Sequence, residues 1–464
     1  MSNASNGAVA ESSLRRSLRL VVAGGSLAMV YSTGVTSPAT TEFFRAIGAS
    51  EFHFGLITGL PMVMLLLQFA GAWYGNLARR RKPCFMWLLI LCRLVYLPIA
   101  FLPLVLAGSP GRAVGVSVAL MAVSAGLQNF ATPLWFSWMA DLIPPALLNR
   151  FWAWRQRSMH LTWTASYLLV TLFLYAVRRP PTFQFPLLVV AALVAGVADI
   201  LLFLRVDEPP NSVVQRPLAG ALAEPWRHRH YRRFLVFQCC WTFATNFAAP
   251  FLQLYVLKML GVPVWLTALV WCLAGVGTAM AARMWGRAAD RHGQRPILNI
   301  CTTLKPAIMV AFLFASRDNV LWLLAPVMFF DGALNSGNMV AANGFMLKLA
   351  PRHNRGMFVA AITGLAGLCG GLSAILGGLF LGRGEHLAVE AFGRTWNRYH
   401  LLFALSFVLR LAVIPLARRV REPASTGSRQ VLAEILGPFP MTVLRSPLLV
   451  YRRLRSFGRE DGAG

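Results

Sequence analysis

Long apolar runs alternate with short polar and basic segments along almost the whole sequence. Each run holds about twenty residues or more, enough for a helix to cross a hydrocarbon layer about 30 Å thick. Helices are the expected spanning structure, because lipid offers no partner for a free backbone N–H or C=O group. The pattern predicts twelve spans, at residues 18–44, 53–77, 83–106, 113–139, 154–176, 185–205, 233–257, 264–284, 296–316, 320–347, 356–381 and 399–418.

Short sequences recur in the two halves of the chain, in the same order and at nearly the same spacing. The pairs are GNLARRRKP (75–83) and GRAADRHGQRP (286–296), GLQN (126–129) and GALN (332–335), PPALLNRFWAWR (144–155) and PRHNRGMFVAA (351–361), and RVDEP (205–209) and RVREP (419–423). One match could arise by chance, but an ordered set indicates tandem duplication of a six-span unit.

The repeats define the expected domain organisation. We expect an all-α membrane protein with twelve transmembrane helices in two pseudo-symmetric six-helix halves, 18–205 and 233–420. A polar linker, 206–232, joins the halves, and an N-terminal segment, 1–17, and a basic tail, 421–464, flank them. A pair of parallel six-helix repeats with a substrate path between them is a known transporter plan.

Composition agrees with this interpretation. Charged residues make up 13% of the chain, against roughly 25% in soluble proteins, and mean hydropathy is +0.58. The net charge of +27 is explained by the positive-inside rule. If both termini are cytoplasmic, the cytoplasmic segments hold 32 of the 44 Lys and Arg residues and the outer segments hold 9. We therefore expect a protein of the plasma (inner) membrane bilayer and no nucleic-acid partner.

The loop motif GRAADRHGQR fits the pattern G-x-x-x-D-R-x-G-R-[RK], with Gln294 in place of one arginine. Through this motif and the duplicated twelve-span plan, the chain resembles the major facilitator superfamily from about residue 18 to 420. The resemblance implies an alternating-access carrier. It also implies a charged latch on the cytoplasmic side, made by Gly286, Asp290, Arg291 and Gly293. The alternative is a solvated turn that only obeys the positive-inside rule.

The first copy of the motif departs from the pattern. It is two residues shorter, and Arg79 stands where the second copy has its aspartate. Either this latch has decayed, or a carboxylate from elsewhere supplies the partner. Asp141, at the end of span 4, is the candidate.

In the fold that the resemblance implies, spans 1, 4, 7 and 10 line the central cavity, and polar residues concentrate in these spans. Amides are costly to expose to lipid, so this face should point at water or protein. The alternative is hydrogen bonding between helices that only holds the bundle together. The candidate substrate-binding residues are Tyr31, Thr36, Gln128, Asn129, Trp135, Trp241, Asn246, Asn335 and Asn338.

Ionisable residues inside the predicted spans are the strongest candidates for a functional role. Asp331 lies near the middle of span 10, where a carboxylate is costly unless paired and can serve as a proton-coupling site. The alternative is a structural ion pair with a basic residue of another span. Arg93 and Lys305 are 212 residues apart and so repeat-equivalent, and we expect internal pairing for both and for Arg410. The alternative is that these cations contact an anionic substrate. Glu42 is either a gate or an exposed residue.

Small and kinking residues also carry expectations. We expect Pro38, Pro133 and Pro250 to kink cavity helices. Gly367 and Gly371 should form a small-residue packing seam.

The sequence thus favours a secondary active transporter that moves a small organic solute by alternating access, with protons as a candidate coupling ion. The alternative is a transport-fold flippase for lipids or amphiphiles, or a solute sensor. No Walker sequence, H-E-x-x-H motif or cysteine pair with metal-ligand spacing is present, so we expect neither an enzyme nor a cofactor or metal. We expect a monomer.

Overall fold

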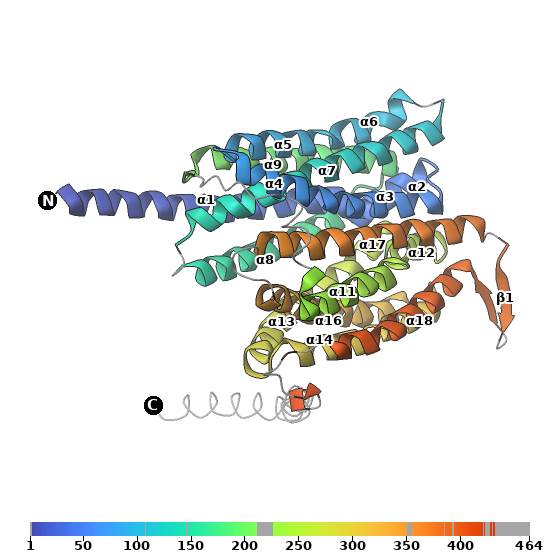
Figure 1. Cartoon of the computed structure of the whole chain (residues 1–464). Coiled ribbons are helices and arrows are strands. Elements are labelled where there is room, and N and C mark those ends of the chain that lie inside the picture. The colour runs from blue at the N-terminus through green and yellow to red at the C-terminus, as the bar shows by residue number, and fades with distance from the viewer. Residues whose placement is uncertain are drawn as a thin grey trace, which may run out of the picture.

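The computed structural model is a bundle of helices that also contains one small β-hairpin (Figure 1). It describes residues 2–106, 108–144, 147–210, 226–349, 355–384, 386–391 and 394–420, together with 422, 427, 428, 430 and 431. Most of the expected linker and tail therefore lies outside the described residues.

The first half contains six spans built from the following elements. They are α1 (Ser2–Thr36) with α2 (Pro38–Ala46), α3 (Glu51–Val63) with η1 (Met64–Leu66) and α4 (Leu67–Leu77), α5 (Lys82–Leu94) with α6 (Tyr96–Val105), α7 (Pro110–Leu142), α8 (Leu148–Ala176), and α9 (Pro181–Leu201) with η2 (Leu202–Arg205).

The second half repeats this order. Its elements are α11 (Arg229–Asn246) with α12 (Ala249–Lys258), α13 (Val264–His292), α14 (Gln294–Leu304) with α15 (Ala307–Leu313), η3 (Val320–Leu324) with α16 (Ala325–Leu349), α17 (Arg355–Arg383), the hairpin strands β1 (Ala388–Ala391) and β2 (Arg394–Asn397), and α18 (Arg398–Arg419).

The twelve predicted spans are confirmed. Within the described residues, twelve helices are long and apolar enough to cross a membrane, and each coincides with one expected run. The hairpin that precedes the last span was not predicted. Its strands pair antiparallel, with Ala388 opposite Asn397.

Two of the three expected proline kinks are confirmed. Span 1 breaks between Thr36 and Pro38, and span 7 breaks between Asn246 and Ala249, with Pro250 in the first turn of α12. Proline suits the first turn of a helix because its missing N–H would have no intrahelical acceptor there. Pro133 lies inside α7, which runs through it without interruption, so the kink expected there stays a prediction.

The two halves approach most closely where α3 lies along α17. A Cβ atom on Gly59 would lie 2.6 Å from the carbonyl oxygen of Gly371, and one on Gly371 would lie 2.5 Å from that of Gly59. A Cβ on Gly367 would lie 2.7 Å from the carbonyl oxygen of Met62. The expected glycine seam is therefore confirmed, and it joins the two halves.

Candidate functional site

Two ends of the bundle are distinguished by their charge. We call the end that carries residues 78–82, 205–208, 291–295, 418–420 and 422 the basic face, and the other end the opposite face. The N-terminal part of α1 projects from the bundle at the basic face (Figure 1).

At the opposite face, one buried carboxylate of the first half binds three side chains of the second half. Glu51, at the start of α3, accepts hydrogen bonds from Lys258 Nζ at 2.6 Å, Arg398 Nη2 at 2.9 Å and the Tyr399 hydroxyl at 3.1 Å. The side chain of Glu51 is only 5% exposed, so these charge-assisted bonds are shielded from water. Glu51 therefore joins the halves at this face.

Sequence reasoning missed Glu51 and considered Glu42 instead. Glu42 pairs with Arg45 in the same helix, at 2.5 Å, so it does not bridge the halves. The available signal for Glu51 was an acidic residue directly after Ser50, the residue that precedes α3, in a chain with only 17 acidic residues.

A second bond between the halves lies close by. The Thr41 hydroxyl of α2 donates to Gln253 Oε1 of α12 at 3.1 Å. These positions are 212 residues apart and share the alignment of Pro38 with Pro250, so they are repeat-equivalent.

At the basic face, both halves contain the same hydrogen-bonding arrangement, in which a glutamate that follows the sixth span accepts from two backbone N–H groups at the start of the third span. In the first half, Glu208 accepts from the backbone N–H groups of Arg81, at 2.5 Å, and Lys82, at 2.9 Å. In the second half, Glu422 accepts from those of Gln294, at 2.7 Å, and Arg295, at 2.9 Å.

These two glutamates come from the RVDEP and RVREP repeats, and each caps the start of the third span of its half. A carboxylate is favourable at a helix N-terminus because the first N–H groups have no intrahelical acceptor. The bonds tie the sixth span of each half to its third span.

Asp141 supplies a carboxylate to the first motif copy, as hypothesised, but to a different arginine. Its Oδ2 lies 2.6 Å from Arg81 Nη2, and Arg81 also donates to the Ser137 hydroxyl at 2.6 Å. Arg81 is fully buried, whereas Arg79 is exposed. The cation that meets Asp141 is therefore Arg81.

The second motif copy behaves only partly as expected. Gly293 has a φ of 86°, which permits the tight turn between α13 and α14. Asp290 is exposed and makes no ion pair or hydrogen bond within the described chain. Arg291 is exposed and has an interaction partner. Gly286 makes no close helix contact, since a Cβ there would meet nothing within 4 Å. The latch is thus not formed by Asp290 in this conformation.

A chain of polar side chains crosses between the halves deeper in the bundle. Gln68 Nε2 donates to Asn129 Oδ1 at 3.2 Å, and the Thr363 hydroxyl donates to Gln68 Oε1 at 2.9 Å. Asn129 was a candidate substrate residue. Gln68 was missed because span 2 looks aliphatic, although it is the only amide there apart from Asn76 near the end of the span.

The second half holds a buried charge cluster made by Lys305, Asp331, Asn335 and Arg410. Lys305 Nζ lies 3.4 Å from Asp331 Oδ1 and also contacts Asn335 Oδ1, and Asn335 Nδ2 donates to Asp331 Oδ2 at 2.8 Å. Arg410 lies near enough to interact electrostatically with Asp331 and Lys305, and donates to the Thr245 carbonyl at 3.3 Å.

The structural alternative for Asp331 therefore holds in this conformation, because Lys305 pairs with it. The cluster has two cations and one carboxylate, so its formal charge is +1. Asn335 is exposed and the Asp331 side chain is 18% exposed, which makes these two the accessible side of the cluster.

The first half has a matching but neutral arrangement. Arg93 Nη2 lies 3.2 Å from Asp199 Oδ2, and the Arg93 guanidinium lies over the ring of Tyr31 at 4.0 Å from its centroid. The expected internal pairing of Arg93 and Lys305 is confirmed.

The candidate substrate residues divide into three sets by exposure. Thr36 and Asn335 are exposed, and Gln128, Asn129, Asn246 and Asn338 are half-buried. The remaining three are aromatic and buried: Tyr31, Trp135 and Trp241.

The buried aromatics pack in the interiors of the halves and line no accessible surface in this conformation. Trp241 lies stacked at 6.3 Å from Phe237. The Arg155 guanidinium covers Trp135 at 4.6 Å. An aromatic residue in a polar stripe suggested a binding surface, but a large apolar ring is more strongly stabilised by burial.

The family is shown by comparison with known proteins. The sequence profile described as "Major Facilitator Superfamily" matches residues 22–378 and 272–456. The chain belongs to the major facilitator superfamily and is an integral membrane protein of twelve apolar helices. No curated protein matches its sequence.

Solved structures with the same fold include transporters for unrelated solutes. A mutant of the nucleoside transporter NupG matches with a TM-score of 0.67 and 11% identity, over 87% of this chain and 100% of that one. A D-xylose-proton symporter gives 0.66 and 14%, over 89% and 98%. The inward-open xylose transporter XylE from E. coli gives 0.61 and 15%, over 91% and 99%. At such identities these matches show the fold alone.

Proposed function

We propose that the protein is a secondary active transporter that moves a small organic solute across the plasma membrane by alternating access. In this proposal the halves 18–205 and 233–420 move as units about the linker 206–232. The basic face is cytoplasmic, as the excess of Lys and Arg there suggests.

One observation carries the proposal. The polar bonds made by Glu51 and Thr41 join the two halves at the opposite face. The bonds made by Glu208, Glu422 and Asp141 at the basic face each stay within one half. A carrier in its inward-facing state needs this distribution, because one face must be closed while the other can part.

The solute is proposed to reach the accessible amides of spans 4 and 10 beside the Asp331 cluster. The charge of +1 there favours a solute that presents oxygen acceptors. Proton coupling follows if a proton on Asp331 competes with Lys305, because neutralising the carboxylate releases a cation toward the cavity.

The test is flux into proteoliposomes with a radiolabelled panel of nucleosides, pentoses and organic acids, with and without a pH gradient. We expect gradient-driven accumulation of one solute class. Asp331→Asn should abolish that accumulation but retain solute exchange in the absence of a gradient. Asp199→Asn is the matched control, since it breaks the other buried pair and should leave the ratio of accumulation to exchange unchanged.

Two results would contradict parts of the proposal. Flux that ignores both the gradient and Asp331→Asn removes proton coupling. Absence of flux across the whole panel, with scrambling of labelled lipid, supports the flippase, and absence of both supports the sensor.

A further inference from the structure

A cationic pocket opens at the basic face of the second half, away from the proposed solute path. Its volume is about 650 Å³. The side chains that line it are five arginines and two aliphatic residues, namely Arg232, Arg233, Val236, Arg295, Leu416, Arg418 and Arg419.

The position of these residues places the pocket at the level of lipid headgroups. Arg232 and Arg233 lie in the first turns of α11, Arg295 is the second residue of α14, and Arg418 and Arg419 end α18. All five therefore sit at the same end of three membrane spans. Basic pockets between spans on the cytoplasmic side are a recurrent binding place for anionic headgroups.

The two aliphatic residues lie one step further toward the membrane interior. Val236 follows Arg232 by one helical turn and is 43% exposed, and Leu416 precedes Arg418 at the end of α18. The pocket thus combines a cationic part with an apolar wall on its hydrocarbon side, which matches a headgroup followed by acyl chains.

The cations of this pocket are not repeated at most of the aligned positions of the first half. The alignment of Pro38 with Pro250 places Leu20 and Val21 opposite Arg232 and Arg233. The alignment of RVDEP with RVREP places Leu204 opposite Arg418. Three of the five arginines therefore have apolar counterparts.

The corresponding place in the first half is also closed by other contacts. Asp207, next to Glu208 in RVDEP, accepts hydrogen bonds from Ser13 at 2.5 Å and Ser17 at 2.9 Å on the long N-terminal part of α1. Its carbonyl accepts from Trp138 at 2.9 Å. A carboxylate there would also repel a second anion.

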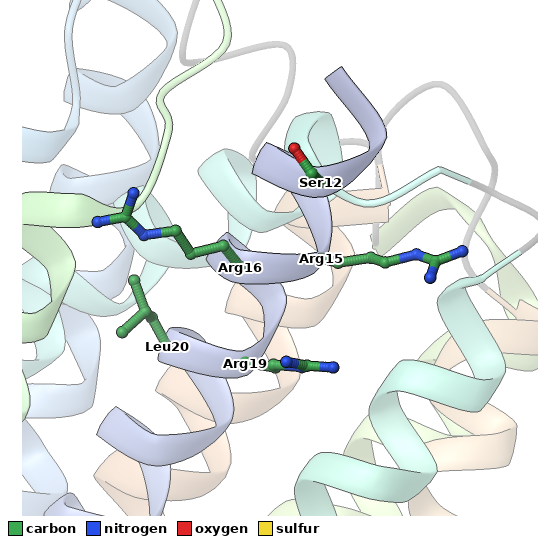
Figure 2. Close-up of a pocket in the computed structure, with 5 residues that line it drawn as sticks. All are labelled: Ser12, Arg15, Arg16, Arg19 and Leu20. Atoms are coloured by element: carbon green, nitrogen blue, oxygen red, sulfur yellow. The ribbon is translucent and has the colours of Figure 1, made fainter. Parts of the chain in front are cut away.

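The arginines of α1 form a different kind of cluster. Figure 2 shows Arg15 and Arg19 on one side of the helix and Arg16 and Leu20 on the other. The residues that line the pocket in Figure 2 all come from one helix, whereas those of the pocket in the second half come from three helices.

Arg295 lies at the pocket with hydrogen-bonding capacity to spare. Its Nη2 donates to the Arg418 carbonyl at 3.2 Å, while its Nε is buried without an acceptor among the described residues. A phosphate oxygen is a strong acceptor for guanidinium N–H groups, and the exposed side chains of Arg232, Arg418 and Arg419 can donate to a headgroup in the pocket.

We propose that this pocket binds the phosphate headgroup of an anionic phospholipid from the cytoplasmic leaflet. The bound lipid links α11, α14 and α18, the first, third and last spans of the second half. The proposal rests on the cytoplasmic placement of the basic face given under the proposed function, but it does not depend on solute transport, which the lipid-binding experiment leaves untouched.

Native mass spectrometry of the purified full-length protein, with added dioleoylphosphatidylglycerol or dioleoylphosphatidylcholine, tests the site. We expect the protein to retain the anionic phosphatidylglycerol and to retain little of the zwitterionic phosphatidylcholine. The double variant Arg232→Gln/Arg418→Gln should lower the affinity for phosphatidylglycerol about thirtyfold, since each arginine near such a surface contributes about a factor of five to the binding constant. Both side chains are exposed, so folding should persist.

Arg16→Gln with Arg19→Gln is the matched control, because it removes two exposed arginines of the same face in the other half. Phosphatidylglycerol retention should be unchanged in it. Equal retention in wild type and in the Arg232/Arg418 variant would overturn the proposal, as would equal loss in the control. Displacement of the lipid by an equal concentration of inorganic phosphate would assign the site to a free anion instead.

Discussion

Glu51 shows how much of the contact between the halves depends on a single residue. It is a buried carboxylate with two cations and a phenol from two different spans of the other half. Its repeat-equivalent position, 212 residues later, is Pro263, so the duplicated position cannot supply a second carboxylate of this kind.

Glu51→Gln should loosen the opposite face. Loss of a buried charge-assisted hydrogen bond costs about 1.5–3 kcal/mol, so hydrogen–deuterium exchange in α2 and α12 should accelerate by about tenfold or more. Glu42→Gln is the control, because Glu42 pairs only with Arg45 within α2. Unchanged exchange in the Glu51 variant would show that the Glu51 contacts do not hold this face together.

Single residues were the least predictable part of the site. The sequence identified Arg93, Lys305 and Asp331 as ionisable residues inside spans, because charge at that depth is rare. It could not assign Asp199 to Arg93, since pairing depends on how the spans are arranged in space. Glu51 was missed because it lies at a loop boundary, where an acidic residue is unremarkable by sequence.

At the scale of elements, the contact between α3 and α17 is set by glycine. Gly59 and Gly371 each lie so close to the other's carbonyl that neither tolerates a Cβ without a backbone shift. This seam runs between the halves, so its geometry bears on any relative motion of the two.

Gly59→Ala should lower the free energy of unfolding by about 1–3 kcal/mol, because the added methyl group meets backbone. Thermal unfolding in detergent measures the change. Gly115→Ala is the control, since a Cβ there has open space, and the better helix propensity of alanine should make it neutral or stabilising by up to ~1 kcal/mol. Equal thermal unfolding midpoints for the two variants would show that α3 and α17 accommodate the added methyl group without loss of stability.

Helix breaks illustrate what periodicity and proline can and cannot predict. Pro38 and Pro250 each lie in the first turn of a new helix that follows a break in the span, whereas Pro133 lies inside the continuous helix α7. The three look alike in sequence, and the difference arises from the packing that surrounds each one. The GRAADRH segment was expected to be a loop but continues α13 to His292, so only Gly293 makes the turn.

At the scale of the whole molecule, the duplication predicted the fold well. Twelve apolar runs and ordered repeats determined the number and order of the spans, because spanning a bilayer leaves little choice of structure. The conformational state was beyond prediction, since both faces must be able to close in an alternating-access carrier and the same sequence specifies both.

The helix caps made by Glu208 and Glu422 allow a test of whether equivalent contacts in the two halves contribute equally to stability. Glu208→Ala and Glu422→Ala should each cost about 0.5–2 kcal/mol, the usual cost of losing a helix cap. The double variant should be additive within ~0.5 kcal/mol, because the two sites lie in different halves. Thermal unfolding measures this, with Asp290→Ala as an exposed carboxylate control on the same face. If only one of the two variants were destabilised, the glutamate changed in the other variant would not stabilise its half.

The bond between Thr41 and Gln253 also bears on how such a molecule arises. A symmetric dimer of six-helix chains would bring this position face to face with its own copy, and the residue there would have to be self-complementary. Fusion into one polypeptide removes that requirement. A hydroxyl donor of one half can then meet an amide oxygen of the other, so gene fusion allows an unequal pair of residues to bond across the pseudo-two-fold axis, where a homodimer would place two identical residues.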